Sequence, residues 1–162
     1  MSYGGIVIYI FLVILVIIIA ILFTIGIDNL ARLPDSTNIV NNMILDTVIG
    51  VGSFVVIFLI FLIAVGLIAA ILSYYSTVVS NSYTLYAAIT FTIATFGLIF
   101  LEIYFYTEFK LYAPVTDDID IINSSTSDFQ WGIGLTIFVF ILSLIALVII
   151  WIDYNIPYNI LS

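Results

Sequence analysis

The stretch ILDTVIGVGSFVVIFLIFLIAVGLIAAILS, residues 44–73, decides the fold class. It is apolar almost throughout, and it exceeds the ~20 residues that a helix needs to cross about 30 Å of hydrocarbon. It is filled with Ile, Leu, Val and Phe and lacks the polar and apolar alternation of a membrane barrel strand. The stretch therefore predicts a transmembrane helix.

Three further apolar runs of similar length lie at residues 5–27, 83–106 and 129–152. The chain of 162 residues is 65% hydrophobic and 7% charged, and a soluble domain needs much more polar surface than this. The first run lacks the basic leader and the small-residue cleavage site of a signal peptide, so we expect it to be a span. The sequence predicts an all-α integral membrane protein with four transmembrane helices.

The beginning of the second run recurs at the beginning of the fourth. DTVIGVG at 46–52 matches DFQWGIG at 128–134 in an Asp followed by Gly-x-Gly. The segments before them also match, since a span and a Pro-containing polar loop precede each motif. We therefore predict two tandem, parallel helical-hairpin repeats, residues 1–78 and 79–162, with loops at 28–43 and 107–128.

The two motifs favour a structural role over a nucleotide site. A dinucleotide-binding fingerprint needs a third glycine and a preceding strand, and the sequence offers neither. We expect Asp46 and Asp128 to cap the second and fourth helices. Gly52 and Gly134 would let these helix ends approach a neighbour closely.

Small residues predict which helix faces are in contact. In the third span they recur in a row at helical spacing, which indicates close helix contact and makes this span the expected centre of the bundle. The row consists of Ala87, Thr90, Ala94 and Gly97. A shorter row, Gly66 and Ala70, lies in the second span, whereas the first span has large branched residues and is expected to face lipid or a partner subunit.

A second stripe of the third span carries Thr92, Thr95 and Glu102. Glu102 is the one acid placed well inside a predicted span, and an intramembrane carboxyl is by default a functional candidate. A proton or ion relay that uses Glu102, Thr92 and Thr95 is one interpretation. The alternative is an interfacial carboxyl that reaches water or a neighbouring hydroxyl.

The composition excludes several chemistries. The chain has no Cys and no His, which rules out disulfides, thiolate or imidazole catalysis and His-ligated metal sites. No nucleophile–base pair or metal cluster is visible, so we expect no enzymatic activity, no cofactor and no bound metal. The partners we expect are membrane lipid, further copies of the chain or other membrane subunits, and not nucleic acid.

Each predicted hairpin is broadly similar to the short two-helix hydrophobic capsid proteins of spindle-shaped archaeal viruses. The similarity covers the two-span architecture and the Pro- and Asn-containing segment LPDSTNIVNN at 33–42. It implies a subunit of a membrane-containing shell, and the isoleucine-rich, base-poor composition fits an archaeal, thermoacidophilic source. A duplicated hairpin is also similar to the rotary-ATPase proteolipids, but these have Gly-rich first and third spans and an acid in the second or fourth.

Together these features predict a non-catalytic structural or accessory subunit of an oligomeric membrane assembly. A virion membrane and a multi-protein respiratory-type complex are both open as settings. A small ion or proton channel or transporter that uses Glu102 is the alternative function. The sequence leaves open which side of the membrane the acidic loops face.

Overall fold

The chain folds into four long antiparallel helices. The computed structural model describes residues 3–33, 39–75, 81–113 and 119–155. The helices are α1 (Tyr3–Ala31), α2 (Ile39–Tyr74), α3 (Asn81–Tyr112) and α4 (Ile119–Asn155). Each contains a segment long and apolar enough to cross a membrane, which confirms the predicted class of multi-pass membrane protein.

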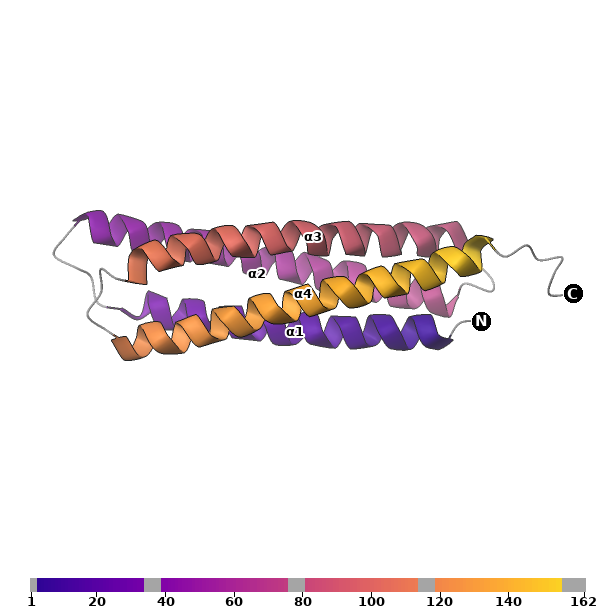
Figure 1. Ribbon diagram of the computed structural model, residues 1–162, viewed down its shortest axis with the longest axis horizontal. Helices are drawn as coiled ribbons and strands as arrows, with labels where there is room; N and C mark the ends of the chain where they lie inside the picture. Colours follow the sequence, from indigo (N-terminus) through magenta and orange to yellow (C-terminus); the bar gives the residue numbers. More distant parts are fainter. Residues whose placement is uncertain (1–2, 34–38, 76–80, 114–118, 156–162) are drawn as a thin grey trace, which may run out of the picture.

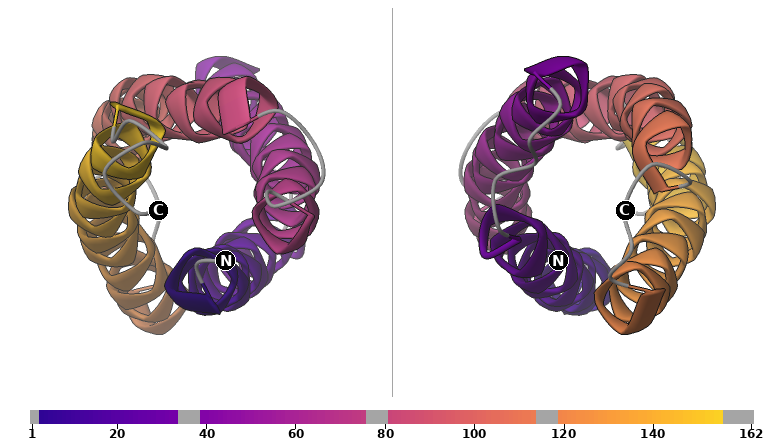
Figure 2. Two further views of the ribbon diagram at one scale, coloured as in Figure 1. Left: turned by 90° about the vertical axis from the view of Figure 1, so that its right-hand side faces the viewer. Right: turned by 90° about the vertical axis from the view of Figure 1, so that its left-hand side faces the viewer.

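The helices form a ring in chain order. α1 contacts α2 and α4, and α3 contacts the same two neighbours. In Figure 1, α1 and α3 end, and α2 and α4 begin, at one end of the bundle, which we call the loop end, and the marks for both chain ends lie at the other. Viewed along its axis, the bundle places the four helices around a common centre (Figure 2). The prediction that the third span forms the centre is therefore wrong, because each helix has two equivalent neighbours.

The buried residues of every helix include a continuous series whose spacing alternates between three and four residues. In α1 these positions are Tyr9, Leu12, Val16, Ile19, Phe23, Gly26, Leu30 and Leu33. In α2 they are Leu45, Val48, Gly52, Val55, Leu59, Leu62, Gly66, Ala69 and Ser73. In α3 they are Thr84, Ala88, Phe91, Thr95, Leu98, Glu102, Phe105, Phe109 and Tyr112. In α4 they are Ile122, Ser125, Phe129, Gly132, Thr136, Val139, Ser143 and Ala146.

This 3.5-residue repeat explains the shape of the bundle. A straight helix has 3.6 residues per turn, so a strict seven-residue repeat keeps facing its partners only if the helices wind around each other with a left hand. The helices accordingly cross at an angle, which is clearest for α4 in Figure 1. α1 supplies as continuous a buried face as the other helices, so the lipid or partner subunit that the first span was expected to face can meet only its outer face.

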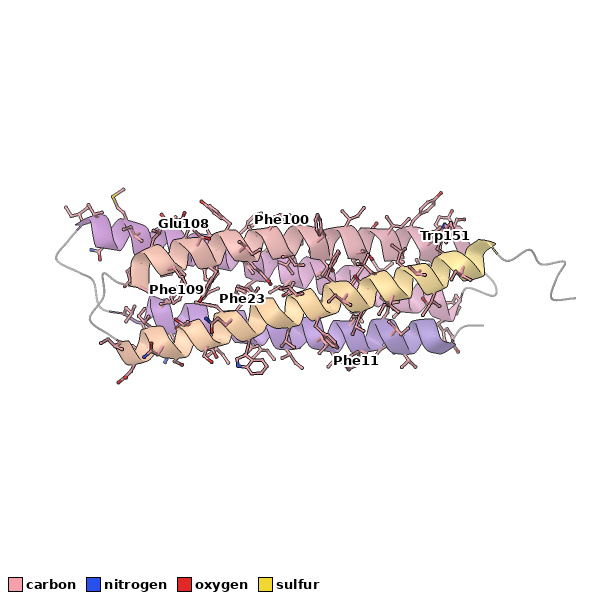
Figure 3. The ribbon with its side chains drawn as sticks, viewed as in Figure 1. Phe11, Phe23, Phe100, Glu108, Phe109 and Trp151 are labelled. Atoms are coloured by element: carbon pink, nitrogen blue, oxygen red, sulfur yellow. The ribbon has the colours of Figure 1, made fainter. Side chains whose placement is uncertain are left out.

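The outer surface is apolar over most of its length. Large side chains point outward from all four helices, among them Val7, Phe54, Ile93 and Ile141. Figure 3 shows Phe11 and Phe100 pointing away from the bundle, whereas Phe23 and Phe109 lie between the helices. Lipid tails solvate such a surface well, and water does not.

The helices continue beyond this apolar surface at the loop end. α2 and α4 have 36 and 37 residues, about 54 Å at 1.5 Å per residue, which exceeds the hydrocarbon thickness of about 30 Å. Exposed polar side chains encircle the bundle there; this polar collar comprises Asp28, Arg32, Asp46, Lys110, Asp120, Asn123, Ser124 and Gln130. The predicted loops at 28–43 and 107–128 were therefore too long, because much of both segments is helical.

Candidate functional site

Among the described residues, Glu102 is the one acidic or basic side chain that is buried inside the bundle. Its side chain has no solvent exposure, and it occupies a core position of α3 between Leu98 and Phe105. Burial of a carboxyl group costs free energy unless hydrogen bonds replace the lost water. The surroundings of Glu102 therefore form the candidate site.

The partner of Glu102 is Thr136 of α4. The Thr136 hydroxyl lies 2.8 Å from Glu102 Oε1 and 2.9 Å from the carbonyl oxygen of Gly132, one turn back in the same helix. The second carboxyl oxygen, Oε2, is buried and has no hydrogen-bond partner. Sequence analysis missed Thr136, which is equally buried, although its distance from Gly132 and Val139 fits the seven-residue repeat of α4.

The other predicted relay residues share the interior with Glu102 but do not bond to it. Thr95 lies seven residues before Glu102, which is about 10 Å along the helix. Its hydroxyl donates to Phe91 O at 2.8 Å, and the Thr92 hydroxyl donates to Ala88 O at 2.9 Å and lies 3.5 Å from Ser143 O of α4. These bonds satisfy each hydroxyl largely within its own helix and do not link it to the carboxyl.

Four aromatic rings separate Glu102 from the loop end. This aromatic cluster consists of Phe23, Phe105, Phe109 and Phe129, each at most 1% exposed. The Phe129 ring lies 4.7 Å from that of Phe105, 5.0 Å from that of Phe109 and 5.5 Å from that of Phe23, measured between centroids. Edge-to-face and tilted rings at such distances attract one another in addition to filling space.

Buried glycines make room for these rings. A Cβ added to Gly132 of α4 would lie 2.5 Å from a ring carbon of Phe23, and one added to Gly26 of α1 would lie 2.5 Å from a ring carbon of Phe129. α1 and α4 thus each insert a phenylalanine against a glycine of the other helix. Gly52 and Gly66 of α2 each lie against two helices. A Cβ added to Gly52 would lie 2.7 Å from Ile27 of α1 and 2.9 Å from Phe105 of α3, and one added to Gly66 would lie 2.6 Å from Val13 of α1 and 3.0 Å from Phe91 of α3.

Of the four Asp-x-x-x-Gly-x-Gly residues singled out in the sequence, Gly52 lies at a close helix contact, whereas Asp46, Asp128 and Gly134 do not act as predicted. Asp46 and Asp128 lie inside α2 and α4, seven or more residues after the first helical residue, and neither is a helix cap. Gly134 is exposed, and an added Cβ there would meet nothing within 4 Å, so it does not mediate close packing within the chain. The paired glycines also differ in environment, because Gly52 and Gly132 are buried and their matches, Gly134 and Gly50, are exposed.

The predicted small-residue row of α3 lies largely outside the core. Thr90 and Gly97 are exposed and Ala87 is half-buried, whereas Ala94 is buried with 9% exposure. The face of α3 that meets the other helices lies next to the small-residue row and carries Thr95 and Glu102. The row was misassigned because the core of α3 is built from large side chains packed over glycines of its neighbours. The short row of α2, Gly66 and Ala70, does lie in the core.

The interior holds one more unpaired polar atom. The Tyr9 side chain of α1 is completely buried, its ring lies edge-to-face against Phe91 at 5.7 Å, and its hydroxyl has no hydrogen-bond partner. Tyr9 lies near the beginning of α1 and Glu102 lies in the last third of α3, and these two helices run in the same direction, so the two residues are far apart along the bundle axis.

At the loop end, by contrast, several exposed polar groups are paired. Gln130 of α4 donates to the Tyr106 hydroxyl of α3 at 2.9 Å, and the Lys110 ammonium lies 5.1 Å above the Tyr106 ring. Asp28 and Arg32 form an ion pair at 2.9 Å on α1. Such exposed contacts contribute little stability each.

Comparison with known proteins gives no relative. No protein-family model matches the chain, and neither a curated protein nor a solved structure is significantly similar to it.

Proposed function

We propose that the protein is a non-catalytic structural or accessory subunit that associates with copies of itself, or with other membrane subunits, through the outer face of α3. The observation that supports this is the outward position of Thr90 and Gly97, with Ala87 beside them. Around Gly97 there is open space for a Cβ, so a neighbouring backbone can come close.

Within lipid, small outward residues favour contact between helices. Lipid tails are as apolar as leucine, so helices associate where small side chains let their backbones pack closely, and not where apolar area alone is large. Thr90 and Gly97 are seven residues apart and so stay on the same side of a supercoiled helix. The outward faces of α2 and α4 also have one open glycine each, Gly50 and Gly134, whereas bulky outward residues such as Val7, Phe54 and Ile141 suit fluid lipid.

Two settings fit a subunit of this kind: the membrane of an archaeal virion and a multi-protein complex of respiratory type. The origin by duplication of a hairpin belongs to the same proposal. The duplication is supported by the pattern of buried positions, which both halves repeat. The alignment that pairs Gly52 with Gly134 is not supported, because Gly52 is buried and Gly134 is exposed. A relay or channel through Glu102 is the alternative, supported by the unpartnered Oε2 atom.

Cysteine cross-linking tests the α3 interface, since the chain has no Cys of its own. We expect Gly97→Cys to give a reducible dimer in the native membrane, because a disulfide needs Cα atoms about 4.4–6.8 Å apart and only a close helix contact supplies this. Val7→Cys on α1, which is also exposed, is the matched control and should stay monomeric on a denaturing gel.

Two results would count against this interface. One is an equal dimer yield from Gly97→Cys and Val7→Cys, which would indicate random collision. The other is a Gly97→Cys chain that remains monomeric and cross-links to no other membrane subunit. In either case α3 would be a lipid-facing helix like the others.

A further inference from the structure

We propose that Glu102 is a proton-binding site, which holds its proton while the bundle is closed and releases it only when α3 and α4 move apart. This inference is independent of the proposed structural function, because it concerns the interior of one chain and not its outer face. It rests on the hydrogen bonds of Glu102 and Thr136 and on the sealed position of both residues.

The hydrogen bonds at Thr136 favour a protonated Glu102. A threonine hydroxyl has one hydrogen, yet the Thr136 oxygen lies within 2.9 Å of both Glu102 Oε1 and Gly132 O. A protonated Glu102 satisfies both contacts, since the carboxyl donates to Thr136 and Thr136 donates to the Gly132 carbonyl. An ionised Glu102 would accept the hydrogen bond of the Thr136 hydroxyl at Oε1. The negative charge would then be buried on a carboxylate whose other oxygen, Oε2, receives no hydrogen bond.

The ligand that fits this site is a proton and not a metal ion. The bonded group consists of one carboxyl, one hydroxyl and one backbone carbonyl. Divalent cations take six or more oxygen ligands in a regular shell, whereas a proton needs only a donor and an acceptor. The neighbouring core positions on α3 are Leu98 and Phe105, which offer no oxygen from their side chains.

The surroundings make release of the proton depend on a movement of the helices. Towards the loop end, the aromatic cluster covers Glu102, with Phe105 and Phe129 only 4.7 Å apart between centroids. Towards the termini, the next hydroxyl of α3, that of Thr95, is bonded to its own helix. Neither direction offers a hydrogen-bonded path, so water reaches the carboxyl when α3 and α4 separate.

The titratable side chains of α3 within about one turn of Glu102 are Tyr104, which is exposed, and Tyr106, which is half-buried. The other acids of the described residues lie farther away along the bundle. The acids nearest to it along the other helices lie towards the loop end, and each is exposed or half-buried: Asp28 of α1, Asp46 of α2 and Asp128 of α4. On α3 itself, Glu108 lies six residues on, about 9 Å along the axis, and is half-buried. A buried protonated carboxyl therefore has a spectroscopic signature distinct from that of the other acids.

Infrared difference spectroscopy on the full chain in lipid bilayers at neutral pH tests the bound proton. We expect wild type minus Glu102→Gln to show the carbonyl stretch of a protonated carboxylic acid, and wild type minus Glu108→Gln to lack it. Thr136→Val should shift that band to the frequency of a carbonyl with a weaker hydrogen bond. Carboxylate bands in place of the acid band, or a Thr136→Val spectrum identical to that of the wild type, would overturn the assignment.

Stability as a function of pH tests the coupling to helix separation. The closed bundle binds a proton that the opened one releases, so the stability of the wild type must fall as the pH rises. Glu102→Gln has a neutral amide that does not titrate, so its stability should no longer fall with rising pH. Glu108→Gln keeps Glu102, and its stability should still fall as that of the wild type does. Parallel curves for wild type and Glu102→Gln would show that the proton is not linked to opening of the bundle.

Discussion

Replacement of Phe129 by alanine should lower the free energy of unfolding by about 3 kcal/mol or more, the usual cost of deleting a buried ring. Phe129 is completely buried and packs against the rings of Phe23, Phe105 and Phe109, which come from two other helices. In lipid this loss is one of van der Waals contact, because the cavity left behind has no atoms to replace those of the ring.

The matched control is Phe11→Ala, which deletes the same ring from the outer face of α1, where it is 47% exposed (Figure 3). We expect a change within about 0.5 kcal/mol, as for other substitutions outside a packed core. The measurement is reversible unfolding in mixed micelles, followed by circular dichroism. Equal losses for Phe129→Ala and Phe11→Ala would mean that the aromatic cluster does not hold the helices together.

A second large effect is expected from one methyl group on α4. The Cβ of Gly132→Ala would lie 2.5 Å from a ring carbon of Phe23, so the ring or the helix must move, and overpacking of this kind costs about 1–3 kcal/mol. Gly134→Ala, two residues away, meets nothing within 4 Å. It should be neutral or stabilising, because alanine favours the helix over glycine by about 1 kcal/mol.

A rescue experiment distinguishes this clash from a general effect of position 132. Phe23→Leu removes the ring edge that meets the new methyl group, so the double variant Phe23→Leu, Gly132→Ala should recover part of the loss. Thermal unfolding in detergent is measured for the wild type, Gly132→Ala, Gly134→Ala, Phe23→Leu and the double variant. If Gly132→Ala and Gly134→Ala change the midpoint alike, α1 and α4 do not interlock as described.

The number and position of the spans could be predicted because hydropathy reports directly where lipid replaces water. The helix ends could not, because a helix continues as long as its inner face stays buried. Leu45 and Ile122 are buried although their exposed neighbours Asp46 and Asn123 are polar. A hydropathy average includes the polar residues of the outer face as well as the apolar residues of the inner face. The span that it predicts therefore ends before the helix does.

The buried faces were harder to predict. In α1 nearly every residue is apolar, so the positions that face inward, such as Val16, do not stand out from Ile17 or Ile18. In α3 the signal was present, since Phe91, Leu98 and Phe105 are each seven residues apart. It was overlooked because small residues were taken to mark the packed face.

The candidate site was predictable in part. Glu102 stood out in sequence as an acid within a span, but its contact with Thr136 depends on how α3 and α4 pair, which no local pattern reports. The Gly26–Phe129 and Gly132–Phe23 contacts likewise join segments that are far apart in the chain. Such pairings become visible only once the helices are arranged in space.

The central claim, that a seven-residue repeat turns Glu102 and its face of α3 inward, is tested most directly by a spin-label scan. Single cysteines placed at each position from 85 to 105 carry a nitroxide, and the accessibility of each to oxygen dissolved in the bilayer is measured. We expect the deepest minima at Ala88, Phe91, Thr95, Leu98, Glu102 and Phe105, and low accessibility also at the buried Leu85, Thr92 and Ala94. Minima at Ala87, Thr90 and Gly97, with high accessibility at position 102, would contradict the account.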